Sequence, residues 1–295
     1  MVRGDGRQLA SGFKNSQNVA QGCIRRDSAD EVPRDRGSIG VNTGNTLKQR
    51  WRRGEVAYGG WCSAGSPFIA ELIALQGFHF VGLDAQHGLF GYDSILTTLM
   101  ALGRTGSTPI VRMPSGDPAA AGKILDAGAH GVIFPMIETV DDAAAAVAAC
   151  RIHPSGRRSF GPMRAAQSFG RDPRDVSDGA ACILMIETMR GVENAERIAA
   201  VESVDCIYIG PGDLAITLGL PPGLEPIAGT HADAVDHVRD SAVANQLAVG
   251  MPCADSEAAL RLAARGFNFI PVGSDTWWLM AQAKSEFARL SPSQR

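Results

Sequence analysis

Residues 182–215 read CILMIETMRGVENAERIAAVESVDCIYIGPGDLA, and this stretch contains the pattern that decides the fold. Two short apolar runs, 182–187 and 205–210, are separated by a more polar segment. A short run that is apolar on nearly every residue is typical of a strand buried on both faces, as in a parallel sheet. The stretch therefore predicts one strand–helix–strand unit.

The same pattern repeats along the chain from Leu47 onward. Between the apolar runs lie segments with helical spacing, such as 117–128 and 255–266, which begin with Asp and end on Gly. Eight strands that alternate with helices predict an α/β fold closed into a (β/α)₈ TIM barrel. The predicted strands are 56–62, 78–84, 108–114, 131–136, 182–187, 205–210, 247–251 and 267–273.

Residues 1–46 differ in kind from the rest of the chain. They are polar, rich in Gly and Arg, and lack both sustained periodicity and the apolar core of a signal peptide. We predict that residues 1–46 are a disordered polar extension, or sequence upstream of the natural start, and that residues 47–295 form the barrel domain.

Composition excludes several classes of protein. Apolar residues make up 45% of the chain and the net charge is −3, so no basic surface for nucleic acid is expected. No run approaches the roughly 18 apolar residues of a membrane helix. The six cysteines are scattered, which favours reduced thiols. We expect a soluble cytoplasmic protein whose partners are small molecules, with no membrane or nucleic acid.

In a (β/α)₈ barrel the chemistry lies where strands end and the following loops begin. Buried charges are costly unless they are paired or bound to a metal, so ionisable residues clustered at strand ends need an explanation. The aromatic and ionisable residues at these positions are Trp61, Asp84, His87, Arg112, Glu187 and Asp213.

Glu187 and Asp213 follow consecutive strands and should face one point. Two carboxylates with open positions suit a hard divalent cation such as Mg²⁺ or Mn²⁺. The alternative is an acid pair held by Arg190 or another arginine. The turn 210–213 (GPGD) would present backbone amides, including that of Gly212, to a substrate carboxylate, although such turns are often only turns.

The ends of the first three strands offer a base, a cation and an apolar wall. Asp84 beside His87 is the usual preparation of a general base, although a lone histidine is often only a structural hydrogen bonder. Arg112 suits a developing oxyanion, or else forms an ion pair with Glu187 or Asp84. Trp61 would line the pocket or pack in the core.

The lysines argue against imine chemistry. A Schiff-base aldolase needs a lysine in its pocket, and none of the four lysines lies at a predicted strand end. They are Lys14, Lys48, Lys123 and Lys284.

Several segments in order resemble the HpcH/HpaI aldolase family, the metal-dependent class II pyruvate aldolases such as 2,4-dihydroxyhept-2-ene-1,7-dioate aldolase. The resemblance covers roughly residues 47–290. It implies a carbon–carbon lyase of aromatic or sugar-acid catabolism that reversibly cleaves a 4-hydroxy-2-keto acid to pyruvate, or a related 2-keto acid, and an aldehyde. The segments are LDAQH (83–87), PIVRMPSGDP (109–118), GRRSFGP (156–162), MIETMRGVEN (185–194), YIGPGDLA (208–215) and VGSDT (272–276).

The resemblance also implies roles for individual residues. Glu187 and Asp213 would ligate Mg²⁺, Mn²⁺ or Co²⁺, and the amides of Gly212 and Asp213 would hold the keto-acid carboxylate. Arg112 would stabilise the enolate oxygen. His87, oriented by Asp84, would act as the base through water.

Two residues depart from the family's pattern, and the resemblance also implies an oligomer. Gln86 stands where some members have Glu, and Met185 where some have Gln, which leaves substrate choice and the positioning of water on the metal open. The family forms hexamers in which the last helix packs on a neighbouring barrel. This suits the Trp277–Trp278 helix, which would otherwise pack on its own barrel.

Two other functions remain open. An acyl-CoA lyase, like the malyl-CoA or citramalyl-CoA lyases, needs a basic cleft for the CoA phosphates. A catalytically silent barrel that binds a keto acid is the second. We place the Arg157–Arg158 loop at the entrance without assigning it a role. The loop arginines available for CoA are Arg157, Arg158, Arg164 and Arg171.

Overall fold

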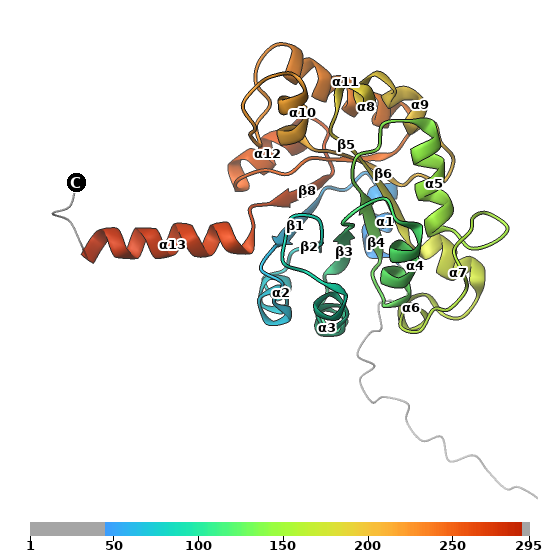
Figure 1. The fold of residues 1–295 in the computed structure, drawn as a ribbon. Helices are drawn as coiled ribbons and strands as arrows, with labels where there is room; N and C mark the ends of the chain where they lie inside the picture. The colour runs from blue at the N-terminus through green and yellow to red at the C-terminus, as the bar shows by residue number, and fades with distance from the viewer. Residues whose placement is uncertain (1–44, 291–295) are drawn as a thin grey trace, which may run out of the picture. The chain divides into compact units, whose positions relative to one another are not determined.

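Parallel strands close into a barrel in the computed structural model, which describes residues 45–290 (Figure 1). Each strand pairs with its neighbour in sequence, and the last pairs with the first, so the predicted (β/α)₈ barrel is confirmed. The strands are β1 (Ala57–Cys62), β2 (Phe80–Asp84), β3 (Thr108–Arg112), β4 (Gly131–Phe134), β5 (Ala181–Ile186), β6 (Cys206–Ile209), β7 (Ala248–Gly250) and β8 (Phe269–Val272).

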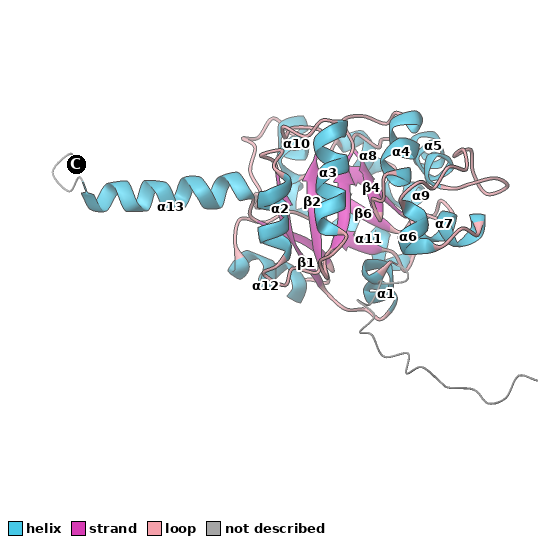
Figure 2. Cartoon of the chain, turned by 90° about the horizontal axis from the view of Figure 1, so that it is seen from below, coloured by secondary structure: helices cyan, strands magenta, loops and turns pink. Residues whose placement is uncertain are grey.

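Helices surround the strands on the outside of the barrel (Figure 2). Predicted caps are confirmed: Asp117 accepts a hydrogen bond from the amide of Ala119, and Asp255 accepts one from Ala258. The helices are α1 (Thr46–Arg52), α2 (Pro67–Ala74), α3 (Tyr92–Leu102), α4 (Pro118–Asp126), α5 (Val140–Cys150), α6 (Ala165–Phe169), α7 (Pro173–Gly179), α8 (Met189–Glu193), α9 (Ala195–Ala199), α10 (Pro211–Thr217), α11 (Thr230–Ala244), α12 (Ser256–Ala264) and α13 (Asp275–Leu290).

Aromatic side chains fill the barrel interior. The rings of Phe80 and Phe269 lie 4.4 Å apart, and the Phe80 ring comes within 2.2 Å of where a Cβ on Gly59 would stand. Only glycine therefore fits at position 59 beside that ring. Above this layer, the rings of Trp61 and Tyr208 are stacked with centroids 6.4 Å apart. They form the floor of the barrel mouth at the C-terminal ends of the strands.

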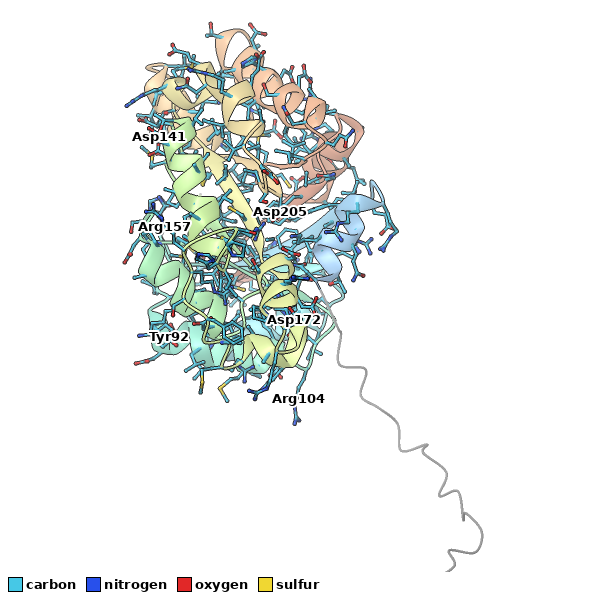
Figure 3. All side chains as sticks on the ribbon, turned by 90° about the vertical axis from the view of Figure 1, so that its right-hand side faces the viewer. Tyr92, Arg104, Asp141, Arg157, Asp172 and Asp205 are labelled. Carbon is cyan, nitrogen blue, oxygen red and sulfur yellow. The ribbon has the colours of Figure 1, made fainter. Side chains whose placement is uncertain are left out.

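An ion network closes the opposite, N-terminal end of the barrel. Lys48 on α1 lies 2.7 Å from one carboxylate oxygen of Asp205, and Arg151 lies 2.8 Å from the other. Figure 3 shows Asp205 close to α1. Burial lowers the pKa of Lys48, and the Asp205 carboxylate opposes that shift. One carboxylate is thus the counter-charge that both buried cations share.

Removing the Asp205 carboxylate should cost much of the protein's stability. Asp205→Asn leaves Lys48 and Arg151 buried without a counter-charge, which typically costs about 3–5 kcal/mol. We expect a loss of that size in urea-unfolding experiments. The exposed control Glu202→Ala should stay within about 0.5 kcal/mol of the parent protein. Equal stability of the two variants would contradict a structural role for the network.

The structure differs from the sequence-based prediction at both ends of the domain. The predicted extension 1–46 lies outside the described residues except for its last two positions. There, Asn45 caps α1 and donates a hydrogen bond of 2.7 Å to the carbonyl of His130. Asn45 and Thr46, which the prediction placed in the extension, thus contact the barrel.

The C-terminal helix α13 packs on its own barrel only through its first turn, where the Trp278 ring stacks on that of Phe78 with centroids 6.0 Å apart. Its first residue, Asp275, is buried and accepts hydrogen bonds from the amides of Ser63 and Ala64. Beyond Thr276 its residues are exposed, and the helix extends away from the strands (Figure 1). Across residues 45–290, none of the helices has the length and apolar character needed to span a membrane.

Candidate active site

Glu187 directly follows β5 and points into the barrel mouth. Its side chain is 1% exposed, and its Oε1 accepts a hydrogen bond of 2.8 Å from the amide of Met136. Its Oε2 has no hydrogen-bond partner among the described residues. Burial, with a smaller contribution from the charge of Asp213, raises the pKa of Glu187 to about 7. A buried carboxylate oxygen without a hydrogen-bond partner is unfavourable unless it binds a proton or a cation.

Asp213 approaches Glu187 from the first turn of α10, just after β6. The two carboxylates therefore meet as predicted. Gly210, the residue after β6, makes this possible, since a Cβ there would lie 2.7 Å from Glu187 Oε2 and 2.6 Å from Met185 Cε. Gly212 lies in the same first turn, beside Asp213.

The backbone of Met136 holds Glu187 from the β4 side. Met136 has φ of 57°, a left-handed conformation that non-glycine residues adopt at a cost. Its side chain is 51% exposed, so burial of that side chain does not account for the conformation. The next amide, of Ile137, bonds to the carbonyl of Met185 and fixes the turn. The sequence contained no signal for this contact, because it comes from a main-chain amide.

Arg112 and Asp84 form a two-point ion pair across the β2–β3 register. Arg112 Nε and Nη2 lie 3.0 Å and 2.5 Å from the two Asp84 oxygens. Burial opposes ionisation of Asp84, but the hydrogen bonds and charge of Arg112 outweigh it and hold the pKa of Asp84 below its usual value. The Arg112 guanidinium also lies over the Trp61 ring, 5.3 Å from its centroid. Among the described residues, these two bonds to Asp84 do not use Arg112 Nη1.

The expected contact between Asp84 and the His87 ring is not found, which corrects one prediction. Asp84 Oδ1 instead accepts hydrogen bonds from the backbone amides of Gln86 and His87, each 3.1 Å long. Within residues 45–290 no hydrogen bond joins the His87 ring to Asp84, because Arg112 and the turn already occupy that carboxylate. His87 is exposed on the lip of the mouth.

A cavity of about 220 Å³ opens at the mouth beside these residues. Trp61, Asp84 and Arg112 line it, as do Met185 and Tyr208. Tyr208 was not predicted as a site residue because it lies inside an apolar strand. Ser63 after β1 and Leu224 also line the cavity. The remaining lining residues lie in or just after β7 and β8 and at the start of α13; these are Pro252, Cys253, Pro271, Gly273, Ser274, Thr276 and Trp277.

The carboxylate pair suits a divalent cation that keeps open positions. In residues 45–290 no three His, Cys, Asp or Glu side chains come together as a metal-binding group. Glu187 and Asp213 would thus supply two ligands, and water or substrate oxygens the rest. The partnerless Oε2 of Glu187 is consistent with such an ion. The residues present fit the metal that the resemblance implies.

A larger cavity, of about 1300 Å³, lies on the flank between α3, α4 and α5. Arg157 and Arg158 line this flank cavity and not the mouth, which corrects their expected position at the entrance. Figure 3 shows Arg157 on the same side of the molecule as Tyr92 of α3. Arg158 pairs with Asp126 at 2.6 Å, and Arg164 bonds to the carbonyl of Ala127. Arg158 and Arg164 are thus used within the fold, which leaves fewer of the loop arginines for a CoA phosphate site.

The described lysines lie away from the mouth, as the sequence predicted. Lys48 belongs to the network at the opposite end of the barrel. Lys123 stands over the Tyr92 ring on the flank. Lys284 lies in the exposed part of α13. Imine formation has no lysine at this site within the described chain.

Comparisons with known proteins agree with this geometry. The family model of the HpcH/HpaI aldolase/citrate lyase family matches residues 57–281. A hydroxypyruvate/pyruvate aldolase of Rhizorhabdus wittichii is 33% identical over 245 residues, 83% of this chain and 98% of that protein. A 4-hydroxy-2-oxovalerate aldolase of Rhodococcus jostii is 34% identical over 253 residues, 84% of this chain and 96% of that protein.

A solved structure gives the same result for the fold. A HpcH/HpaI aldolase/citrate lyase family protein from Burkholderia cenocepacia matches with a TM-score of 0.77 at 33% identity, covering 83% of this chain and 99% of that one. Sequence and structure therefore agree over most of the barrel. This chain belongs to the HpcH/HpaI aldolase/citrate lyase family.

Proposed function

We propose that this chain is a metal-dependent class II aldolase, a carbon–carbon lyase that cleaves a 4-hydroxy-2-keto acid to pyruvate, or a related 2-keto acid, and an aldehyde. The observation that carries the proposal is the buried Glu187 carboxylate, with one oxygen unpartnered, facing Asp213 beside Arg112. The names of the aldolases to which the chain is similar support the same reaction.

Glu187 and Asp213 would hold Mg²⁺, Mn²⁺ or Co²⁺. Such an ion, when bound, draws electron density from the keto oxygen and so favours the enolate. Two carboxylates accept several divalent ions, so the native ion is a matter for measurement. Met136 contributes by fixing one Glu187 oxygen, which leaves the other free.

The remaining site residues bind substrate and move protons. Arg112 Nη1 donates to the substrate's keto oxygen, while Asp84 holds the guanidinium in place. The amides of Gly212 and Asp213 hold the carboxylate, as the resemblance implies. His87, on the lip, takes the hydroxyl proton as the aldehyde leaves, through a water molecule. Protonation of the enolate carbon then gives pyruvate.

The test is release of pyruvate from 4-hydroxy-2-keto acids that differ in their aldehyde portion. We expect release from at least one of them once a divalent ion is supplied. If no keto acid is cleaved but acyl-CoA substrates are, the chain is a CoA-thioester lyase. Keto-acid binding without turnover would identify a silent barrel.

Metal affinity should depend on pH through Glu187. A carboxyl with a pKa of about 7 is protonated below that pH, and the proton competes with the cation. We expect the apparent affinity for Mn²⁺, measured by calorimetry, to fall about tenfold per pH unit below pH 7 and to level off above it. An affinity equal at pH 5.5 and pH 7.5 would contradict the role of Glu187.

The exposed face of α13 supports an oligomer in which this helix packs on a neighbouring subunit, as in the hexamers of the family. Apolar side chains are exposed on both helices concerned. On α2, Phe68 is 65% and Leu72 is 44% exposed. On α13, Leu279 is 68% and Phe287 is 66% exposed. Burying such faces against each other is favourable. Light scattering should give a hexamer, and removal of residues 279–295 should give a smaller species.

The state of the cysteines supports a proposal for the cellular compartment. All cysteines in the described part of the chain are free and buried. Unpaired thiols are typical of proteins kept in a reducing compartment. We place the enzyme in the cytoplasm, where fractionation of cells should recover it.

A further inference from the structure

The cavity at the barrel mouth extends away from the carboxylate pair. Glu187 and Asp213 lie at the ends of β5 and β6, whereas the cavity reaches past Arg112 to β7, β8 and the first turn of α13. With a keto acid held by the carboxylates and Arg112, this adjoining cavity is the space at the described mouth that is left for the second reactant, the aldehyde.

With the two proposed metal ligands left aside, the charges at this cavity sum to one negative charge, that of Asp275. Among the described residues that line it, only Asp84 and Arg112 are charged, and they neutralise each other at 2.5–3.0 Å. Asp275 adds a buried carboxylate directly behind the wall, bonded to the amide of Ser63 at 2.9 Å. Glu187 and Asp213 lie on the other side of Arg112.

Neutral groups make up the rest of the wall. Ser63, Ser274 and Thr276 provide hydroxyl groups, and Trp277 and Tyr208 provide rings. Hydroxyls can bond to a neutral oxygen of a ligand but do not balance a full negative charge. A carboxylate taken out of water into this space would remain unpaired, which is costly.

We propose that the acceptor aldehyde is uncharged, and that the cavity discriminates against aldehydes with a carboxylate. This inference rests on the proposed aldolase function and adds the chemical class of its second substrate. The discrimination comes from repulsion by Asp275 and from the lack of a free cation on the described wall.

A matched pair of aldehydes tests the inference. Succinic semialdehyde and its methyl ester differ by one charge at nearly equal size. With pyruvate and Mn²⁺, we expect kcat/KM for the ester to exceed that for the acid by at least about tenfold. The ratio should narrow as salt is raised, because screening weakens the repulsion. Equal values, or a preference for the acid, would overturn the inference.

Two substitutions of Ser63 test whether the wall of this cavity causes the preference for the uncharged aldehyde. Ser63→Lys places a cation on the wall and should lower the ratio of kcat/KM for the ester to kcat/KM for the acid. Ser63→Gln changes the size of the side chain without adding charge and should leave that ratio unchanged. A ratio that Ser63→Lys does not change would contradict the assignment of the cavity.

A control separates this inference from the proposed function. Exchange of the pyruvate methyl protons with D₂O needs the keto-acid site but no aldehyde. Exchange together with a preference for the charged acceptor overturns only the inference. Absence of exchange and of any aldol product overturns the proposed function and the inference with it.

Discussion

Glu187→Ala is expected to abolish both divalent-metal binding and pyruvate release. The substitution removes one of two carboxylate ligands from a site that offers no third His, Cys, Asp or Glu within residues 45–290. Losing the cation removes several kcal/mol of stabilisation of the developing enolate, so activity should fall by about 1000-fold or more. Calorimetry with Mn²⁺ and a coupled pyruvate assay measure the two losses.

The variant should nevertheless fold. Glu187 is buried with a pKa raised to about 7, which means that its ionised form is unfavourable in the metal-free protein. Its carboxylate is destabilising above that pH, so Glu187→Gln should raise the melting temperature of the metal-free protein at pH 8. The exposed Glu193→Ala is the matched control and should leave metal binding unchanged. An active, metal-binding Glu187→Ala protein would contradict the proposed site.

Arg112→Lys is expected to lower kcat/KM by about 100- to 1000-fold, although the charge is kept. A guanidinium can bond to both Asp84 oxygens and still present Nη1, whereas an ammonium is one compact charge that cannot do both in this geometry. Loss of one donor to a developing oxyanion has an effect of this size. Steady-state kinetics with saturating Mn²⁺ provide the measurement.

The control for Arg112→Lys is Arg190→Lys. Arg190 also contacts a carboxylate, Glu138, but its side chain is 64% exposed. Its substitution should change kcat/KM less than about twofold. If Arg112→Lys were as active as this control, Arg112 would have no direct role in the reaction.

The strands could be predicted because burial on both faces leaves a simple signal. All eight runs contain the observed strands, apart from Ala181, which precedes the fifth predicted run by one residue. Helices α6 to α9 were not predicted individually, since each has only five to seven residues and shows too little periodicity. The location of the site residues at the barrel mouth could also be predicted, because each lies at or just after the end of a strand.

Pairings within the site could not be read from the sequence. Arg112 had two acidic candidates, and only the β2–β3 register, which sets Asp84 opposite Arg112, decides between them. Once that pair forms, the His87 ring loses its expected partner. Met136 gave no signal because a main-chain amide in a left-handed conformation has no characteristic side chain. The apolar residues of α13 likewise do not indicate whether they pack on their own barrel or on that of a neighbouring subunit.

The most direct test of the account is metal dependence of pyruvate release. The protein is treated with EDTA, assayed on a 4-hydroxy-2-keto acid, and assayed again with Mg²⁺, Mn²⁺ or Co²⁺ restored. The account predicts that EDTA abolishes release, that at least one ion restores it, and that no ion restores it in Glu187→Ala. Release that continues at full rate in EDTA would contradict a reaction that depends on a cation held by Glu187 and Asp213.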